Sequence, residues 1–241
     1  MSGHFSARKA SAFAMANAQF SFWSEPTNLK RNLRRLRAIV WLVTIGAGFV
    51  QTWASRFWIE GDGNNYLDVA SAYLCGDWKN IVNAYWSPFL SWLLALCLGV
   101  FHSSPYWDST LLHLLDLVGL LLSLFTFEFF FRAFLRSHIQ LPGSEDAEAS
   151  LSELGWWTLA YSLFLSTSLF VLTVLNTTPD VWVAAFTYLI AGLVVRIAHN
   201  RGGWHWFALL GLALACAYLT KAFYFPISFV FLLMAWLSTG N

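Results

Sequence analysis

The sequence predicts an all-α integral membrane protein, folded as a polytopic bundle of transmembrane helices. Of its 241 residues, 58% are hydrophobic and only 11% are charged, and the mean hydropathy is +0.56. A chain with so few polar residues cannot cover the surface of a soluble globular protein, so we expect it to lie in a lipid bilayer. A second observation agrees, because long uncharged apolar runs alternate with short polar stretches.

The first apolar run, residues 38–55, is long enough to cover most of a hydrocarbon core about 30 Å thick. It follows residues 1–37, which are predicted to form a cytoplasmic N-terminal segment. Residues 38–241 form the predicted transmembrane module, with about six spans in total. The further candidate spans are 111–131, 156–175, 181–198, 204–219 and the Pro-interrupted run 222–237.

The run 88–101 decides the direction of every later span. It is short for a crossing, opens on a proline, and has the length typical of a re-entrant or interfacial segment. If it crosses, the Lys and Arg residues divide almost evenly between the two faces. If it does not, most of them fall on the cytoplasmic side, as the positive-inside rule favours. They are then Arg8, Lys9, Lys30, Arg31, Arg34, Arg35, Arg37, Arg132, Arg136, Arg196 and Arg201.

The non-crossing arrangement makes residues 58–108 one outer loop. A turn-rich stretch at 60–65 precedes an apolar pattern with helical spacing, and Gly76 is placed to end that helix. We expect an amphipathic helix lying on the bilayer, followed by a second short helix between Trp78 and Tyr85. The apolar positions of the first helix are Tyr66, Val69, Ala70, Tyr73 and Leu74.

Three charged residues share the outer face in this arrangement. Asp62 precedes a helix, where a carboxylate could serve as a general base or a metal ligand, and the alternative is a turn or capping residue. Asp180 starts the span 181–198 and could equally be its cap. Lys221 ends an apolar run, where its ammonium either binds a lipid phosphate or extends to the headgroups.

Two further acidic residues lie within predicted spans. Asp116 is deep enough to predict a functional role or a water-filled cavity, and His113 is its expected partner. Glu128 stands four residues before Arg132, which predicts a structural ion pair at the cytoplasmic end.

The outer-loop segments and two later motifs resemble, in the same order, those of the GT-C glycosyltransferases. The resemblance covers roughly residues 38–237 and is nearest to the branch of protein O-mannosyltransferases and aminoarabinose transferases. The segments are Glu60-Gly61-Asp62-Gly63, Tyr66-Leu67-Asp68-Val69-Ala70, Gly76-Asp77-Trp78, the run 85–95, Asn176-Thr177-Thr178-Pro179-Asp180 and the run 211–221 ending in Thr220-Lys221.

This resemblance implies an inverting transferase that moves a sugar from a polyprenyl-phosphate-linked donor to an acceptor hydroxyl of a glycan, lipid or protein. Asp62 is then the catalytic base, and Asp180, Lys221, Tyr66 and Tyr85 bind substrate. The implied location is a bacterial inner membrane, with the site facing the periplasm. Many family members have an Asp-Glu pair where this chain has Asp62-Gly63, so a divalent cation is left open.

Other classes of function remain as alternatives. The resembling enzymes are usually much longer, so the chain is expected to be an N-terminal portion, and a non-catalytic membrane subunit is one alternative. A transporter or permease is another, since intramembrane carboxylates serve proton relays. A nucleic-acid partner is not expected, because the net charge is only +1 and the basic residues make no extended face.

Overall fold

The computed structural model describes residues 26–81, 85–102, 104–139, 151–200 and 203–238. Every regular element in these ranges is helical, which confirms the predicted all-α class for the described part of the chain. In chain order the elements are α2 (Pro26–Ser55), α3 (Gly61–Cys75), α4 (Trp78–Ile81), α5 (Pro88–Phe101), the 3-10 helix η1 (Pro105–Trp107), α6 (Asp108–Ile139), α7 (Glu153–Phe170), α8 (Asp180–Asn200), α9 (Trp204–Thr220) and α10 (Tyr224–Leu237).

Among the described residues, three helical stretches are long and apolar enough to cross a membrane, at Asn28–Ser55, Pro105–Ser137 and Asp180–His199. They contain the spans predicted at 38–55, 111–131 and 181–198. Large apolar side chains also cover the outside of the molecule, which a lipid solvent would stabilise. On α2 the exposed ones are Ile39, Leu42, Val43, Ile45, Phe49, Val50 and Trp53. The structure is therefore consistent with a membrane protein.

Several helix ends differ from the predicted ends. Helix α2 begins at Pro26, well before residue 38, because the intervening stretch is rich in Leu, Lys and Arg, which favour helix. The span predicted at 156–175 is wrong at its end, since α7 stops at Phe170. There the Gln51 side chain donates a hydrogen bond to the Leu169 carbonyl at 2.9 Å and so satisfies one of the terminal carbonyl groups.

The remaining apolar helices are short. Helices α5, α9 and α10 have 14, 17 and 14 residues, and the number of membrane crossings therefore stays a prediction. Residues 1–25 of the predicted cytoplasmic segment lie outside the described residues. So do Val82 in the second short helix of the loop, and Arg8, Lys9 and Arg201 of the basic residues counted for topology.

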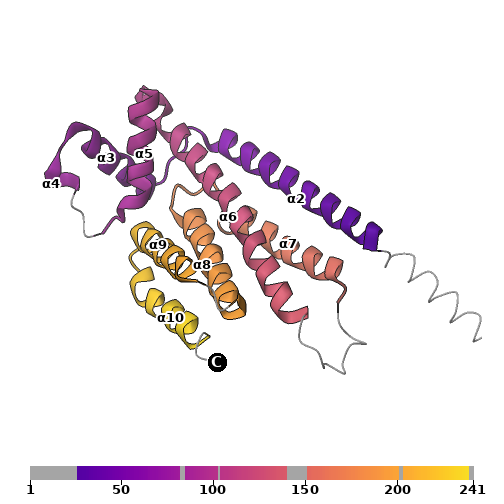
Figure 1. Ribbon diagram of the computed structural model, residues 1–241. Helices are drawn as coiled ribbons and strands as arrows, with labels where there is room; N and C mark the ends of the chain where they lie inside the picture. The colour runs from indigo at the N-terminus through magenta and orange to yellow at the C-terminus, as the bar shows by residue number, and fades with distance from the viewer. Residues whose placement is uncertain (1–25, 82–84, 103, 140–150, 201–202, 239–241) are drawn as a thin grey trace, which may run out of the picture.

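Helix α6 is the centre of the bundle. It packs against α2 and α7 on one side and against α8 on the other, and α8 in turn contacts α9 and α10 (Figure 1). Small residues let α6 and α8 approach closely. A side chain on Gly192 would meet the Phe129 ring at 2.6 Å, and one on Gly119 would meet the Trp182 indole at 2.9 Å.

Helices α3, α4 and α5 gather at one end of the bundle, which we call the Asp62 end (Figure 1). Helix α3 closes at Gly76, whose φ of +67° is a left-handed conformation that suits glycine. The expectation that its apolar face lies on the bilayer is wrong for Tyr66, Val69 and Ala70, which are buried. Instead α3 packs on α5, where the Ser91 hydroxyl donates to the Tyr66 carbonyl at 3.1 Å.

A buried carboxylate holds three helices together at the opposite end. Glu128 of α6 is 1% exposed and pairs with Arg132 at 2.8 Å, which confirms the predicted ion pair. Its carboxylate also accepts hydrogen bonds from two residues of α2 and one of α7. These donors are Arg37 at 3.0 Å, Trp41 at 2.8 Å and Tyr161 at 2.9 Å.

Replacing Glu128 with Ala is expected to destabilise the fold by about 3 kcal/mol, because two guanidinium groups lose their counter-ion and Tyr161 and Trp41 lose an acceptor. Thermal unfolding in detergent measures the change. The control is Asp68→Ala, which removes an exposed carboxylate from α3. Equal loss of stability in the two variants would contradict this account of Glu128.

Candidate functional site

A cavity of about 300 Å³ opens at the Asp62 end, between four segments of the chain. Its lining comes from the start of α3, from the residues before α5, from the loop before α8 and from the break between α9 and α10. Four of the five residues predicted for the site line it, and the fifth, Asp180, is bonded to one of them. We call this cavity the Asp62 pocket; its lining residues are Asp62, Tyr66, Tyr85, Trp86, Ser87, Thr178, Pro179, Lys221, Ala222 and Phe223.

The first turn of α3 is held against the loop that precedes α8. The Thr177 hydroxyl accepts a hydrogen bond from the backbone N–H of Glu60 at 3.3 Å, and Thr177 is fully buried. Gly63 makes this close approach possible, because a Cβ there would lie 2.6 Å from the Cβ of Thr177 and 2.8 Å from Ile59. The glycine that follows Asp62 therefore has a packing role.

The chain between α2 and α3 is fixed by the first turns of α6. The Arg56 carbonyl accepts hydrogen bonds from Ser109 at 2.7 Å and from Thr110 at 3.0 Å. His113 is buried, and its ring nitrogens lie 2.8 Å from the carbonyl oxygens of Trp58 and Val174. These contacts join both loops of the site to one rigid helix.

Asp62 is the second residue of α3, within its first turn. The backbone cap position belongs to Glu60, and no side chain caps this helix end. The Asp62 carboxylate is exposed, and it has no hydrogen-bond or ion-pair partner among the described residues. This group is therefore available to accept a proton or a hydrogen bond from a molecule in the pocket.

Asp180 and Lys221 form an ion pair across the pocket wall. The Lys221 ammonium donates to one carboxylate oxygen of Asp180, and the Thr178 hydroxyl donates to the other at 2.9 Å. Lys221 reaches this position because its backbone is extended, with φ −149° and ψ 125°, where α9 ends. Asp180 is thus both the first residue of α8 and the ion-pair partner of Lys221. The Lys221 ammonium is bonded to a protein carboxylate instead of lying free at the surface.

Tyr66 lies beneath the charged groups and is only 4% exposed. Burial raises the pKa of its hydroxyl above the ordinary value, and the negative charges of Asp62 and Asp180 raise it further. The hydroxyl therefore keeps its proton at physiological pH and can donate a hydrogen bond. Its ring packs edge-on against Trp86, with the centroids 5.1 Å apart, and Trp86 packs in the same way on Tyr85.

Asp116 is completely buried in α6, and the expectation that His113 is its partner is wrong. His113 instead contacts backbone carbonyls, because it faces the α2–α3 connection. Among the described residues, neither carboxyl oxygen of Asp116 has a hydrogen-bond partner, and the same is true of the Trp182 indole N–H. Asp116 lies within electrostatic range of Tyr66, which places it at this end of the molecule.

Thr177 and Thr178 have positional roles that the sequence interpretation did not assign. The sequence contained a signal for both roles, since both threonines belong to the motif that ends in Asp180. In the described part of the chain, no three His, Cys, Asp or Glu side chains are close enough to hold a metal ion.

No protein-family model, no curated protein and no solved structure matches this chain. Its class is therefore defined by its own features. Its described part is all-helical, with three helices able to cross a membrane and a charged pocket at one end of the bundle.

Gly63→Ala is expected to destabilise the protein by about 1–3 kcal/mol, because the added methyl group overlaps Thr177 and pushes α3 away from its loop. The matched control is Gly61→Ala in the same turn, where a Cβ meets nothing within 4 Å. Thermal unfolding of the two variants in detergent measures the difference. If Gly61→Ala is as destabilising as Gly63→Ala, the close packing at Thr177 does not position Asp62.

Proposed function

We propose that this protein is a GT-C-type glycosyltransferase that moves a sugar from a polyprenyl-phosphate donor to an acceptor hydroxyl, with inversion at the anomeric carbon. The observation that carries the proposal is the meeting of Asp62, Tyr66, Tyr85 and Lys221 around one cavity, with Asp180 bonded to Lys221. They come from segments up to 159 positions apart, between Asp62 and Lys221. Resemblance to the family assigned roles to the same residues.

The proposed reaction is a direct displacement. The acceptor oxygen forms a bond to the anomeric carbon while the bond from that carbon to the phosphate oxygen breaks, and the electron pair leaves with the phosphate. Asp62 accepts the proton of the acceptor hydroxyl. A single base opposite the leaving group gives inversion, by the geometry that distinguishes inverting from retaining glycosidases. Asp62 suits this role because it is exposed at a helix N-terminus and unpaired among the described residues.

Lys221 is the proposed partner of the donor phosphate. An ammonium has three N–H donors, and Asp180 takes one of them, so others are available to the charge that develops on the leaving phosphate. Asp180 is then a positioning residue that aims the ammonium, assisted by Thr178. Tyr66 adds a neutral hydroxyl donor at the base of the pocket, and Tyr85 offers an exposed aromatic face to a sugar ring.

The proposed setting is a multi-pass protein of a bacterial inner membrane, with the Asp62 pocket at the periplasmic face. The polyprenyl tail would lie against apolar surface beside the pocket. Exposed Phe223 and Phe225, near the break between α9 and α10, provide such a surface next to Lys221. The acceptor would be a glycan, lipid or protein of the cell envelope.

A second candidate function is proton-coupled transport. It is favoured by Asp116, a fully buried carboxyl group without a partner among the described residues, within a helix able to cross a membrane. The glycosyltransferase proposal accounts for more residues, because a relay through Asp116 gives no role to the exposed carboxylate of Asp62.

Asp62→Asn is expected to lower sugar transfer by about 100-fold or more, because a general base contributes roughly two to four orders of magnitude. The assay supplies membranes containing the full chain with radiolabelled polyprenyl-phosphate mannose or polyprenyl-phosphate aminoarabinose and measures label in endogenous acceptors. The matched control is Asp68→Asn, an exposed carboxylate of the same helix that lies outside the pocket.

Transfer by Asp62→Asn at the rate of the Asp68→Asn control would exclude Asp62 as the base. Absence of transfer by the wild-type chain, together with solute uptake into proteoliposomes that Asp116→Asn abolishes, would favour the transport function instead.

A further inference from the structure

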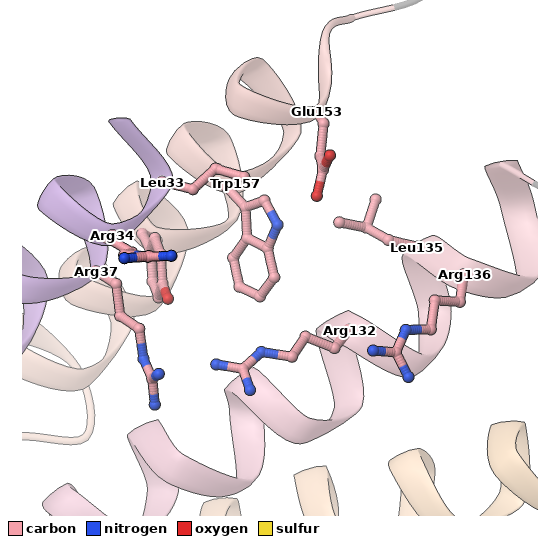
Figure 2. A pocket seen from close by; sticks show the side chains of 9 residues that line it. Leu33, Arg34, Arg37, Arg132, Leu135, Arg136, Glu153 and Trp157 are labelled. Carbon is pink, nitrogen blue, oxygen red and sulfur yellow. The ribbon is translucent and has the colours of Figure 1, made fainter. Parts of the chain in front are cut away.

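A second cavity, of about 400 Å³, lies at the end of the bundle opposite the Asp62 pocket. Four arginines extend into it from two helices, Arg34 and Arg37 from α2 and Arg132 and Arg136 from α6 (Figure 2). Helix α7 closes it with Glu153 and Trp157. We call this cavity the arginine pocket; its remaining lining residues are Leu33, Leu135 and Tyr161.

The charge of this pocket is only partly neutralised. Arg37 and Arg132 pair with buried Glu128, which already receives hydrogen bonds from Trp41 and Tyr161 as well. Arg34 and Arg136 have no acidic partner among the described residues. Glu153 is the one carboxylate in the described lining. Four guanidinium groups against two carboxylates leave a net positive cavity, which favours an anion.

The chemistry of the lining indicates what kind of anion fits. Guanidinium groups bind phosphate through two parallel N–H donors, and several can share one phosphate. The walls between them are apolar, with Leu33, Leu135 and the buried ring of Trp157. A cavity with both features suits an amphiphile whose phosphate meets the arginines while its carbon chains continue along the helices.

The position of the pocket identifies the source of that amphiphile. Arg34 and Arg37 lie near the start of the candidate span 28–55, and Arg132 and Arg136 lie near the end of the span 105–137. Basic side chains near the ends of membrane-spanning helices favour the depth of the phospholipid headgroups, so we expect all four arginines at that depth.

We propose that the arginine pocket is a binding site for the phosphate headgroup of an anionic phospholipid. The site lies at the other end of α6 from the Asp62 pocket, and the proposal does not depend on glycosyl transfer. Arg34 and Arg136 hold the phosphate, and Arg37 and Arg132, oriented by Glu128, complete the charge around it. The bound lipid fills the space between α2, α6 and α7.

The test titrates short-chain phosphatidylglycerol into the purified full chain in a neutral detergent and measures affinity by calorimetry. Arg34→Gln combined with Arg136→Gln is expected to weaken binding by about tenfold or more, because two phosphate contacts are lost. Neither arginine pairs with Glu128, so the fold is retained. The matched control combines Arg31→Gln with Arg35→Gln, which removes the same charge from exposed positions of α2 outside the pocket.

Equal loss of affinity in both double variants would show that the affinity depends on general surface charge, and would contradict a specific site in the arginine pocket. Zwitterionic phosphatidylcholine that binds as tightly as phosphatidylglycerol would overturn the preference for an anionic headgroup. A third titration adds inorganic phosphate as a competitor of the lipid. If phosphate displaces the lipid at a concentration similar to that of the lipid, the pocket binds a free anion, which would contradict a lipid ligand.

The segment 140–150 lies outside the described residues, and its sequence contains three acidic residues, Glu145, Asp146 and Glu148. Neutralising all three with Gln, Asn and Gln is expected to leave lipid affinity within about twofold of wild type. A rise of tenfold or more would show that this segment competes for the pocket and would contradict a lipid as its resident occupant.

Discussion

The buried carboxylate of Glu128 is the interaction on which the arrangement of the bundle depends. It joins α2, α6 and α7 through four donors, and a buried carboxylate without them would be costly. With α6 fixed in this way, its other end becomes a rigid support. There Ser109, Thr110 and His113 hold the chain that leads from α2 to Asp62. One helix therefore positions the arginine pocket at one end and the Asp62 pocket at the other.

At the Asp62 end of the molecule, three carboxyl groups lie in different environments. Asp62 is exposed, Asp180 is paired with Lys221, and Asp116 is buried without a partner among the described residues. Environment decides what each can do, since among these three carboxylates Asp62 alone is both exposed and without a partner among the described residues. The proposed glycosyl transfer assigns one role to each of the first two. Asp116 is buried without a partner among the described residues, and the proposal gives it no role.

Local patterns in the sequence predicted what depends on neighbours along one helix. The spacing of Glu128 and Arg132 predicted their ion pair, and Gly76 predicted the end of α3. Contacts between helices could not be predicted in this way. The sequence contains no signal that Arg37 and Tyr161 meet Glu128, or that His113 contacts backbone carbonyls instead of Asp116. The charge distribution and motif order suggested that Asp62, Asp180 and Lys221 share one end, but not which of them pair.

The most direct test of the proposed function is to locate the residues that bind the donor's phosphate. A polyprenyl phosphate with a photoreactive diazirine beside the phosphate can be crosslinked to the full chain in nanodiscs, and the labelled peptides mapped by mass spectrometry. The account predicts labels on the residues of the Asp62 pocket between Tyr85 and Ser87 and between Lys221 and Phe223. Labels confined to the arginine pocket, or spread over the apolar surface, would contradict it.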